Sequence, residues 1–444
     1  MSKGMAELPA VSFSGDDIMS GRFPSLQARM ALEHGSIYKW VIDSGPDTGE
    51  YIFMVGPEAN RFVMHTGREH FSHDLGWTPI MGDSLGKGLL NMDDPEHARH
   101  RKMWNPAFTS ACMETYLPVI QRVIAERTRD WPECDAVDVY AEAREITFDA
   151  AAAALAGFRT GAEVDRLREL FYTLLHGFDV GEDTWDTFMQ RMLLARDELG
   201  GMLLALIAER RNMPEDQQPR DVVGMIVRAR DEQGQALSDE QLLAHVNILL
   251  VAGHETTTTL GAWVLYLLAT QPEQRRRVQA ELAALLGDSE GPIPVEAIRS
   301  MKMLDNFIKE AGRLYPPVIN VPRGVVKDFE FGGYRVPAGT SVRLALAASH
   351  RLPQIFANPD VFDPDRFAPP REEDKRSPYA LVTFGGGPRI CIGMNFANIE
   401  TKALAAHILR TYTIEPISGH APLHAGHWTA VLPDGLRVRV RERA

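Results

Sequence analysis

The longest helical pattern in the chain begins after Ser238 and ends before Pro272. Ser238 and Gln241 have the spacing of a capping box, which predicts a helix start, and the proline predicts its end. At 1.5 Å per residue, a helix of about 32 residues is about 48 Å long and crosses a whole domain. Its apolar centre suggests a membrane span, but His254, Glu255 and four consecutive threonines interrupt it. We therefore predict a buried core helix with polar side chains at its midpoint.

The remaining pattern predicts a mainly helical body followed by short strands. Residues 95–285 have apolar side chains three and four apart, which is typical of helices. Further helices are predicted at 273–286 and 301–314. Strands are predicted at 51–55, at 329–331 with 334–336 as a hairpin, at 340–346, and at 428–432 with 436–440 as a second hairpin. Because no repeat or Gly/Ser-rich linker divides the chain, we expect one domain over residues 1–444. Its predicted class is mainly α (α+β), with small antiparallel β-sheets beside a helical body.

Composition excludes several kinds of partner and compartment. The chain has 444 residues, with 47 Lys and Arg against 60 Asp and Glu, a formal net charge of −13. Such a chain is a poor partner for a phosphate backbone, so no nucleic acid is expected. Cys112, Cys134 and Cys391 are too few for a disulfide framework and fit a reducing compartment. The first 13 residues lack an apolar segment, so we expect a cytoplasmic protein without a secretion signal or membrane anchor.

A glycine-rich loop at residues 384–393 carries one of these cysteines. Three successive glycines permit close backbone approaches, so the loop can wrap a flat object. Cys391 lies just before a helix predicted to begin near Met394, where the helix dipole favours the thiolate that ligates metals. No Lys-Ser or Lys-Thr follows the glycines, which excludes a phosphate loop, and no Cys-x-x-Cys-His is present, which excludes covalent haem attachment. A buried structural thiol is the alternative for a lone cysteine.

A second group of polar residues occupies the middle of the long helix. Ala252 and Thr256 are four apart and share a face, so a small side chain and a hydroxyl can lie together over a planar cofactor. The hydroxyl can also bond to the carbonyl of Ala252. Glu255 adds a titratable carboxylate, and the set can relay protons to bound oxygen. A zinc motif is incomplete because position 258 is Thr. The alternative pairs Glu255 with an arginine and leaves the threonines bonded to carbonyls.

The cysteine loop resembles the haem-binding loop of the cytochrome P450 family. The family pattern Phe-x-x-Gly-x-Arg-x-Cys-x-Gly is matched at Phe384, Gly387, Arg389, Cys391 and Gly393. Ala252 to Thr256 is similar to the oxygen-activating helix of that family. The resemblance implies haem b with Cys391 as the proximal ligand, whose thiolate pushes electron density onto the iron. It also implies that Thr256 and Glu255 manage protons.

Other matches imply a structural network and an anion site. Glu310 and Arg313 resemble the family's Glu-x-x-Arg helix, and Arg366 lies in a segment that resembles its partner. We expect these three residues to form a buried network near the cysteine loop, without a catalytic role. Four cationic positions match the family's contacts to the haem propionates: His97, Arg101, Arg323 and Arg389.

The resemblance implies a soluble bacterial-type haem-thiolate monooxygenase. Such an enzyme hydroxylates or epoxidises a lipophilic small molecule with dioxygen. Its electrons are expected from a ferredoxin or flavodoxin-type donor with its reductase, and the chain is expected to be a monomer. Three alternatives stay open: a peroxide-driven peroxygenase or isomerase, a non-enzymatic haem sensor, and a cysteine hydrolase. The first two do not need the Glu255–Thr256 pair, and the last lacks a positioned His and Asp signature.

The family pattern also indicates a pocket and an electron-donor surface. Apolar residues expected in the pocket walls suggest a terpenoid, steroid or fatty acid: Trp77, Leu89, Phe171, Leu175, Phe178, Leu250, Val318 and Ile319. Basic residues expected to steer an acidic electron donor are Arg99, His100, Lys102, Lys375 and Arg376.

Overall fold

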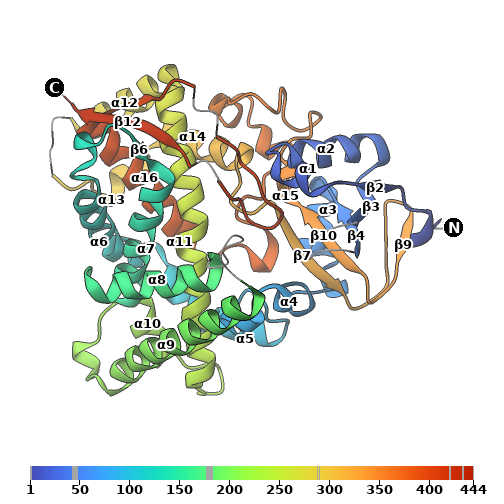
Figure 1. Cartoon of the computed structure of the whole chain (residues 1–444), viewed down its shortest axis with the longest axis horizontal. Helices are drawn as coiled ribbons and strands as arrows, with labels where there is room; N and C mark the ends of the chain where they lie inside the picture. Colours follow the sequence, from blue (N-terminus) through green and yellow to red (C-terminus); the bar gives the residue numbers. More distant parts are fainter. Residues whose placement is uncertain are drawn as a thin grey trace.

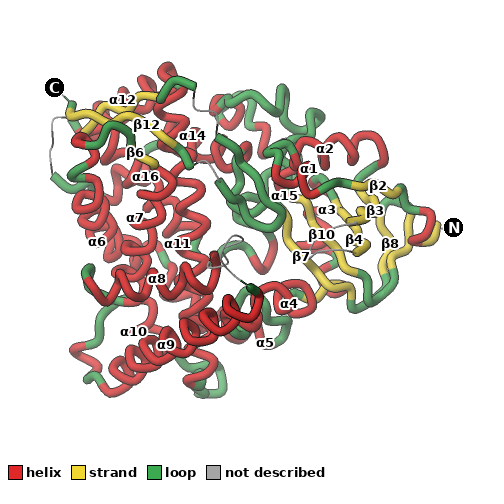
Figure 2. The backbone as a smooth tube through the Cα atoms, viewed as in Figure 1, coloured by secondary structure: helices red, strands yellow, loops and turns green. Residues whose placement is uncertain are grey.

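The computed structural model describes residues 3–42, 49–176, 184–287, 289, 291–419, 422–432 and 435–443. It consists of a large helical part, which contains the C-terminal strand, and a smaller part rich in strands, which holds the N-terminus (Figure 1). Figure 2 shows that the longest helices lie in the first part, while most of the strands lie in the second. No helix in the described part of the chain combines the length and the apolar character that a membrane crossing requires.

The helices follow in chain order. They are α1 (Gly15–Met19), α2 (Phe23–His34), α3 (Pro57–Arg61), α4 (Asp74–Leu85), α5 (Glu96–Trp104), α6 (Ser110–Thr128), α7 (Val139–Ala156), α8 (Ala162–His176), α9 (Trp185–Asn212), α10 (Val222–Arg228), α11 (Asp239–Thr270), α12 (Pro272–Leu286), α13 (Val295–Ser300), α14 (Lys302–Leu314), α15 (Leu346–Ser349) and α16 (Met394–Thr411).

The strands form three sheets. The strands are β1 (Lys3–Gly4), β2 (Ala10–Ser12), β3 (Ile37–Ile42), β4 (Gly49–Met54), β5 (Phe71–Ser72), β6 (Val137–Asp138), β7 (Asn320–Val325), β8 (Phe329–Phe331), β9 (Tyr334–Val336), β10 (Ser341–Ala345), β11 (Tyr412–Pro416) and β12 (Arg437–Glu442). The largest sheet has the order β2-β3-β4-β10-β7-β5, and the others have the orders β1-β9-β8 and β11-β12-β6.

The long helix is confirmed as α11, which has 32 residues. Ser238 caps it as predicted, since its side chain accepts from the N–H of Gln241 and the Gln241 side chain accepts from the N–H of Ser238. Most of α11 is buried, and it packs against α7, α14 and α16. The helix runs through the helical part, and its polar midpoint lies inside the molecule (Figure 1).

The large sheet divides two small apolar cores, because successive residues of a strand point to opposite faces. Ile37 and Ile52 belong to one core, whereas Tyr38 and Phe53 belong to the other. The main core lies among the helices. Apolar periodicity predicted these helices. The pattern of the first 70 residues, by contrast, predicted few of the strands that this segment contributes to the large sheet.

Two predictions about strands are corrected. The sheets are not purely antiparallel, since β1 with β9, β2 with β3 and β4 with β10 are parallel pairs. The hairpin of 329–331 with 334–336 is confirmed as β8 and β9. The second hairpin is wrong, because β12 pairs with β11 and β6, while residues 428–432 make only isolated bridges. Two residues of its expected turn, Pro433 and Asp434, lie outside the described residues.

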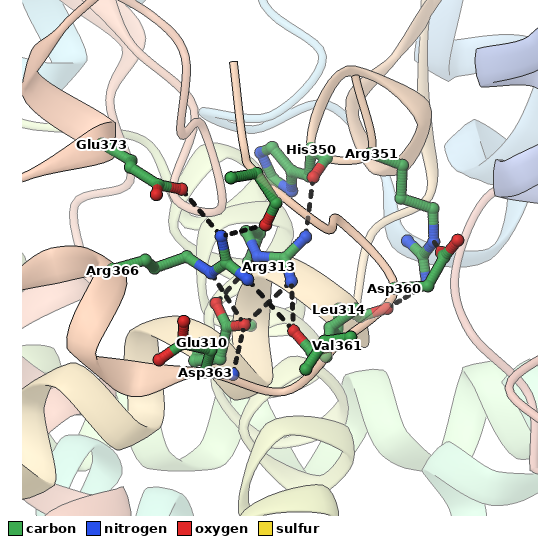
Figure 3. Close-up of polar contacts among 12 residues, drawn as sticks. Glu310, Arg313, Leu314, His350, Arg351, Asp360, Val361, Asp363, Arg366 and Glu373 are labelled. Carbon is green, nitrogen blue, oxygen red and sulfur yellow. Dashed lines mark hydrogen bonds and ion pairs between the residues drawn. The ribbon is translucent and has the colours of Figure 1, made fainter. Parts of the chain in front are cut away.

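The expected buried network joins α14 to the segment that follows α15. Figure 3 shows the guanidinium groups of Arg313 and Arg366 converging on the carboxylate of Glu310. All three side chains have 0% exposure. Arg366 also donates to Glu373, at 2.7 Å. Next to this network, Val382 donates its N–H to the buried His350, so the network borders the segment that leads into the cysteine loop.

Candidate active site

A cavity of about 1180 Å³ lies between α11, α5, α4, β7 and the glycine-rich loop. Pockets for a single small molecule are typically 300–1,000 Å³, so this one has room for a cofactor together with a substrate. All ten site residues predicted from the sequence line it: Ala252, Glu255, Thr256, His97, Arg101, Arg323, Phe384, Arg389, Cys391 and Gly393.

The glycine-rich loop is closed by its own backbone. The N–H of Cys391 donates to the carbonyl of Phe384 at 2.9 Å. Gly387 has a φ of 65°, and a Cβ at this position would collide with the carbonyl oxygen of Met64. The loop therefore needs glycine both for its conformation and for its close approach to a neighbouring segment.

The thiol of Cys391 is free and lines the cavity inside the protein, just before α16 begins at Met394. Burial of its surroundings raises the pKa of this thiol. The N–H groups of Gly393 and Met394 and the charge of Arg101 act in the opposite direction but are outweighed. The N–H groups at the start of the helix thus lower the pKa of the thiol, as predicted, but their effect is smaller than that of burial. Coordination of a metal cation would deprotonate the thiol outright.

The midpoint of α11 contributes a hydroxyl and a carboxylate to the same cavity. The Thr256 hydroxyl donates to the carbonyl of Ala252 at 2.8 Å, as expected from their spacing. Glu255 Oε1 lies 2.9 Å from Nε2 of the fully buried His254. His254 Nδ1 is 2.8 Å from the carbonyl of Leu250, which only accepts, so Nδ1 carries a proton. A second proton must then lie between His254 Nε2 and Glu255.

The alternative partner of Glu255 was an arginine. The structure places Nε2 of His254 2.9 Å from this carboxylate, which also takes part in a further interaction. Arg144 lies close enough for the charge of Glu255 to help raise the pKa of this guanidinium. Glu255 therefore lies close to an arginine, as the alternative expected, and also lines the cavity, as the proton-relay hypothesis expected.

Cationic side chains form one corner of the cavity. Arg323 is buried, and its Nε has no hydrogen-bond partner among the residues that the structure describes. Burial and the nearby Arg389 lower its pKa to about 9. Burial also lowers the pKa of Arg389 and of Arg101. Burial and Arg389 lower the pKa of His97 to about 4. Because burial disfavours all of these charges, an anion in this corner would stabilise them.

This corner fits the carboxylates of a haem. An orphaned, buried guanidinium nitrogen needs an acceptor, and a propionate supplies one. The soft sulfur donor of Cys391 in the same cavity fits haem iron. Sequence reasoning missed His73, which also lines the cavity and whose pKa is held well below its usual value by burial and by Arg323, Arg389 and His97. Nothing local marks His73, since it only precedes α4.

The predicted pocket walls separate into two groups. Trp77, Leu89 and Val318 line the cavity. Phe171, Leu250 and Ile319 are wholly buried in the apolar cores, and Leu175 packs against the main core. Phe178 lies outside the described residues. Ile248 and Leu249 line the cavity in place of Leu250, because residues one or two positions apart on a helix point in different directions.

The predicted basic surface is largely neutralised. Arg99 pairs with Asp231 at 3.2 Å and Lys102 with Glu232 at 2.8 Å. Lys375 pairs with Glu372. His100 is not a surface residue, since it has 0% exposure. The charge run in α5 therefore has partners that the sequence did not indicate.

Three comparisons with known proteins point to the same family. The family model "Cytochrome P450" matches residues 18–438. The chain is 32% identical to "Putative cytochrome P450 136" of Mycobacterium tuberculosis, over 88% of this chain and 80% of that protein. It is 30% identical to "Sterol 14alpha-demethylase" of Mycolicibacterium vanbaalenii, over 89% and 88%. The solved structure "Retinoic acid bound cyanobacterial CYP120A1" has a TM-score of 0.85 and 26% identity and covers 100% of both chains.

The fold and the cavity are thus those of a haem-binding oxidoreductase. The chain belongs to the cytochrome P450 family and is a cytochrome P450 monooxygenase. Its fold is the helical P450 fold with small mixed or antiparallel sheets. Members of this family use haem iron and typically take lipophilic substrates and electrons from redox partners.

Proposed function

We propose that this chain is a single-domain haem-thiolate monooxygenase, over residues 1–444, that hydroxylates or epoxidises a lipophilic small molecule. The observation that carries the proposal is the shared cavity, in which the Cys391 thiol, the Ala252–Thr256 turn, three arginine side chains and His97 all lie in the wall. Electrons would come from a ferredoxin or flavodoxin-type donor and its reductase. The three free cysteines fit the reducing cytoplasm, where we expect the protein to act as a monomer.

The residues of the cavity would hold haem b. Cys391 would ligate the iron, and His97, Arg101, Arg323 and Arg389 would hold the propionates. Phe384, Gly393 and Ala252 would contact the porphyrin. When bound, the haem supplies the activation of dioxygen and the electron transfer.

The protein itself would manage protons and exclude water. Glu255, which shares a proton with His254, and the next residue, Thr256, both line the cavity, and Thr256 would pass a proton from this pair to the reacting atoms. The Thr256 bond to the Ala252 carbonyl keeps the hydroxyl in place. Apolar side chains around the turn, including Leu249 and Val251, keep water away from the reacting atoms. A peroxygenase, an isomerase or a haem sensor would not need this arrangement.

The names of two relatives support a lipophilic substrate. One relative is a sterol demethylase, and the other binds retinoic acid. Both ligands are large and apolar, which agrees with the apolar walls formed by Trp77, Met81, Leu85 and Leu89. A terpenoid, steroid or fatty acid therefore suits this cavity.

The proposal is tested by removing the thiol. The Cys391→Ala variant is expected to lose the long-wavelength Soret band of the reduced carbon monoxide complex, because no other thiol lines the cavity among the described residues. Cys134→Ala is the matched control, since Cys134 is exposed and does not line the cavity. A Cys391→Ala protein that kept the band would contradict the proposal.

A further inference from the structure

His245 is a polar residue in an otherwise apolar part of the cavity wall. It lies on α11, seven residues before Ala252, and both residues line the cavity. Seven residues are about two helical turns, or about 10 Å along the axis. Wall residues that precede α5 or lie beside His245 on α11 are apolar, namely Leu85, Leu89, Ile248 and Leu249. The polar His97 of α5 also lines the cavity and helps to lower the pKa of His245. A polar atom in such a wall discriminates between ligands that pair with it and ligands that do not.

A second histidine holds His245 in place. His100 Nδ1, from α5, lies 2.7 Å from His245 Nε2. The two residues have 0% and 2% exposure, and the ring of Trp104 packs 5.1 Å from that of His245. Burial lowers the pKa of His245 to about 3 and also lowers that of His100. Both imidazoles are therefore neutral near pH 7, and each carries one N–H.

The surroundings of His100 decide which histidine donates. His100 Nε2 is buried and has no hydrogen-bond partner among the described residues. If His100 accepted through Nδ1, this nitrogen would be a buried N–H without an acceptor. Orphaned buried N–H groups are rarer than acceptors without a donor. His100 Nδ1 therefore donates to His245 Nε2, which leaves the proton of His245 on Nδ1.

The free N–H of His245 belongs to a side chain that lines the cavity. Within the described part of the chain, no residue forms a hydrogen bond with Nδ1. Gly88 packs closely on one side of this nitrogen, since a Cβ there would lie 3.2 Å from Nδ1 and 2.8 Å from Cδ1 of Ile248. Nδ1 is nevertheless not among the buried polar atoms of the described residues that lack a partner, so it is accessible from the cavity. A ligand oxygen in the cavity can therefore accept from it.

We propose that His245 Nδ1 donates a hydrogen bond to an acceptor oxygen of the substrate. This inference rests on the proposed function and deepens it by naming a substrate class. The class is an elongated apolar molecule with a carbonyl or carboxylate oxygen roughly 10 Å from the carbon that lies at the Ala252 turn. His100 is the positioning residue, since it sets the tautomer and the ring orientation of His245.

Binding to the purified holoenzyme tests this class. The probes are dodecan-2-one, dodecanoic acid and dodecane, titrated by the spin shift of the haem and, independently, by quenching of tryptophan fluorescence. One neutral hydrogen bond predicts about three- to tenfold tighter binding of the ketone than of the alkane. A larger ratio for the acid than for the ketone identifies a carboxylate as the preferred group, because charged acceptors bond more strongly.

Three variants separate recognition from structure. His245→Phe is expected to bring the ketone-to-alkane ratio to about one while dodecane still binds, and His245→Asn, which keeps an amide N–H, is expected to retain part of the preference. His34→Phe, on an exposed residue of α2, is the matched control.

Several results would overturn the inference. They are equal affinity of the wild type for ketone, acid and alkane, no binding of any oxygenated probe, or a preference that persists in His245→Phe. A purely structural histidine pair would lower the melting temperature of His245→Phe without changing the ratio. The proposed function is judged separately, by the carbon monoxide band and by oxygen-dependent turnover, so its failure is distinguishable.

Discussion

Glu310, Arg313 and Arg366 place three charges in the interior of the protein, where an isolated charge is very costly. Every donor around Glu310 is directed at its two oxygens: both guanidinium groups and the N–H of Asp363. The Arg313 and Arg366 groups also bond to carbonyls, including that of Val361. The network joins α14 to two later segments. It stabilises the fold only if all of its buried charges keep their partners.

Glu310→Gln should therefore destabilise the protein strongly. The amide keeps the shape but removes the negative charge, which leaves the buried Arg313 without a counterion and Arg366 with Glu373 alone. Removing one partner of a buried ion pair typically costs about 3–5 kcal/mol. Urea unfolding measures the change in the free energy of unfolding. Asp365→Asn breaks the exposed Arg277–Asp365 pair in the neighbouring turn and is expected to cost less than about 1 kcal/mol. Similar losses in both variants would contradict this account.

The Thr256 hydroxyl leads to a second prediction for a single residue. Thr256→Ala removes the donor that bonds to the Ala252 carbonyl, and with it the proposed proton path from Glu255. Most of the electrons consumed are then expected in hydrogen peroxide, with less product. Thr256→Ser, which keeps the hydroxyl, should stay close to the wild type. The ratio of product to reductant consumed is the measurement, and an unchanged ratio would remove Thr256 from the relay.

Among the elements, α11 shows how local signals set helix limits. Its capping box and its terminal proline were both readable in the sequence, and the helix has the predicted length. Its neighbours α12 and α14 also follow their periodicity closely. The strands β11 and β12 behave differently, because each is short and its partner lies elsewhere in the chain.

Loss of the cap of α11 should be measurable. Ser238→Ala leaves the N–H of Gln241 without its acceptor and is expected to lower the free energy of unfolding by about 1 kcal/mol. Ser238→Thr keeps a hydroxyl at the cap and should restore most of the stability. Urea denaturation measures the free energy of unfolding of the wild type and of both variants. If the threonine variant were no more stable than the alanine variant, the cap would not be the cause.

In the whole molecule, buried neutral histidines link stability to pH. Burial lowers the pKa of His245, His350 and His424 to about 3. Between that value and the ordinary value near 6.5, the unfolded chain binds more protons than the folded one, so stability falls as the pH falls. Glu400 acts in the opposite sense, because burial raises its pKa well above the usual range. His97, His407 and His427, whose pKa values are lowered mainly by burial to about 4, act in the same sense as the three histidines, so we expect the histidines to set the direction.

Lowering the pH from 7 to 5 should therefore destabilise the holoprotein. Each of the three histidines contributes a loss of roughly 1–2 kcal/mol over this range. Urea unfolding at several pH values measures the slope. Glu400→Gln removes the opposing contribution and should make the loss steeper. A stability that stays level or rises toward pH 5 would contradict the expected balance.

The sequence alone determined the elements and residues whose signals are local. The cap of α11, the glycines of the cysteine loop and the four-residue spacing of Ala252 and Thr256 depend on neighbours along the chain, so they could be read directly. The family motif brought together distant site residues, which the tertiary structure places around one cavity. Their individual roles stay predictions.

Only the tertiary structure decided which distant segments meet. It paired β12 with β11, buried Leu250 in the core while leaving Leu249 in the cavity wall, and joined His100 to His245 across 145 positions. It also brought Asp231 to Arg99. The physical reason is that a hydrogen bond, an ion pair or a strand pairing depends on separation in space, whereas capping and periodicity depend on separation along the chain.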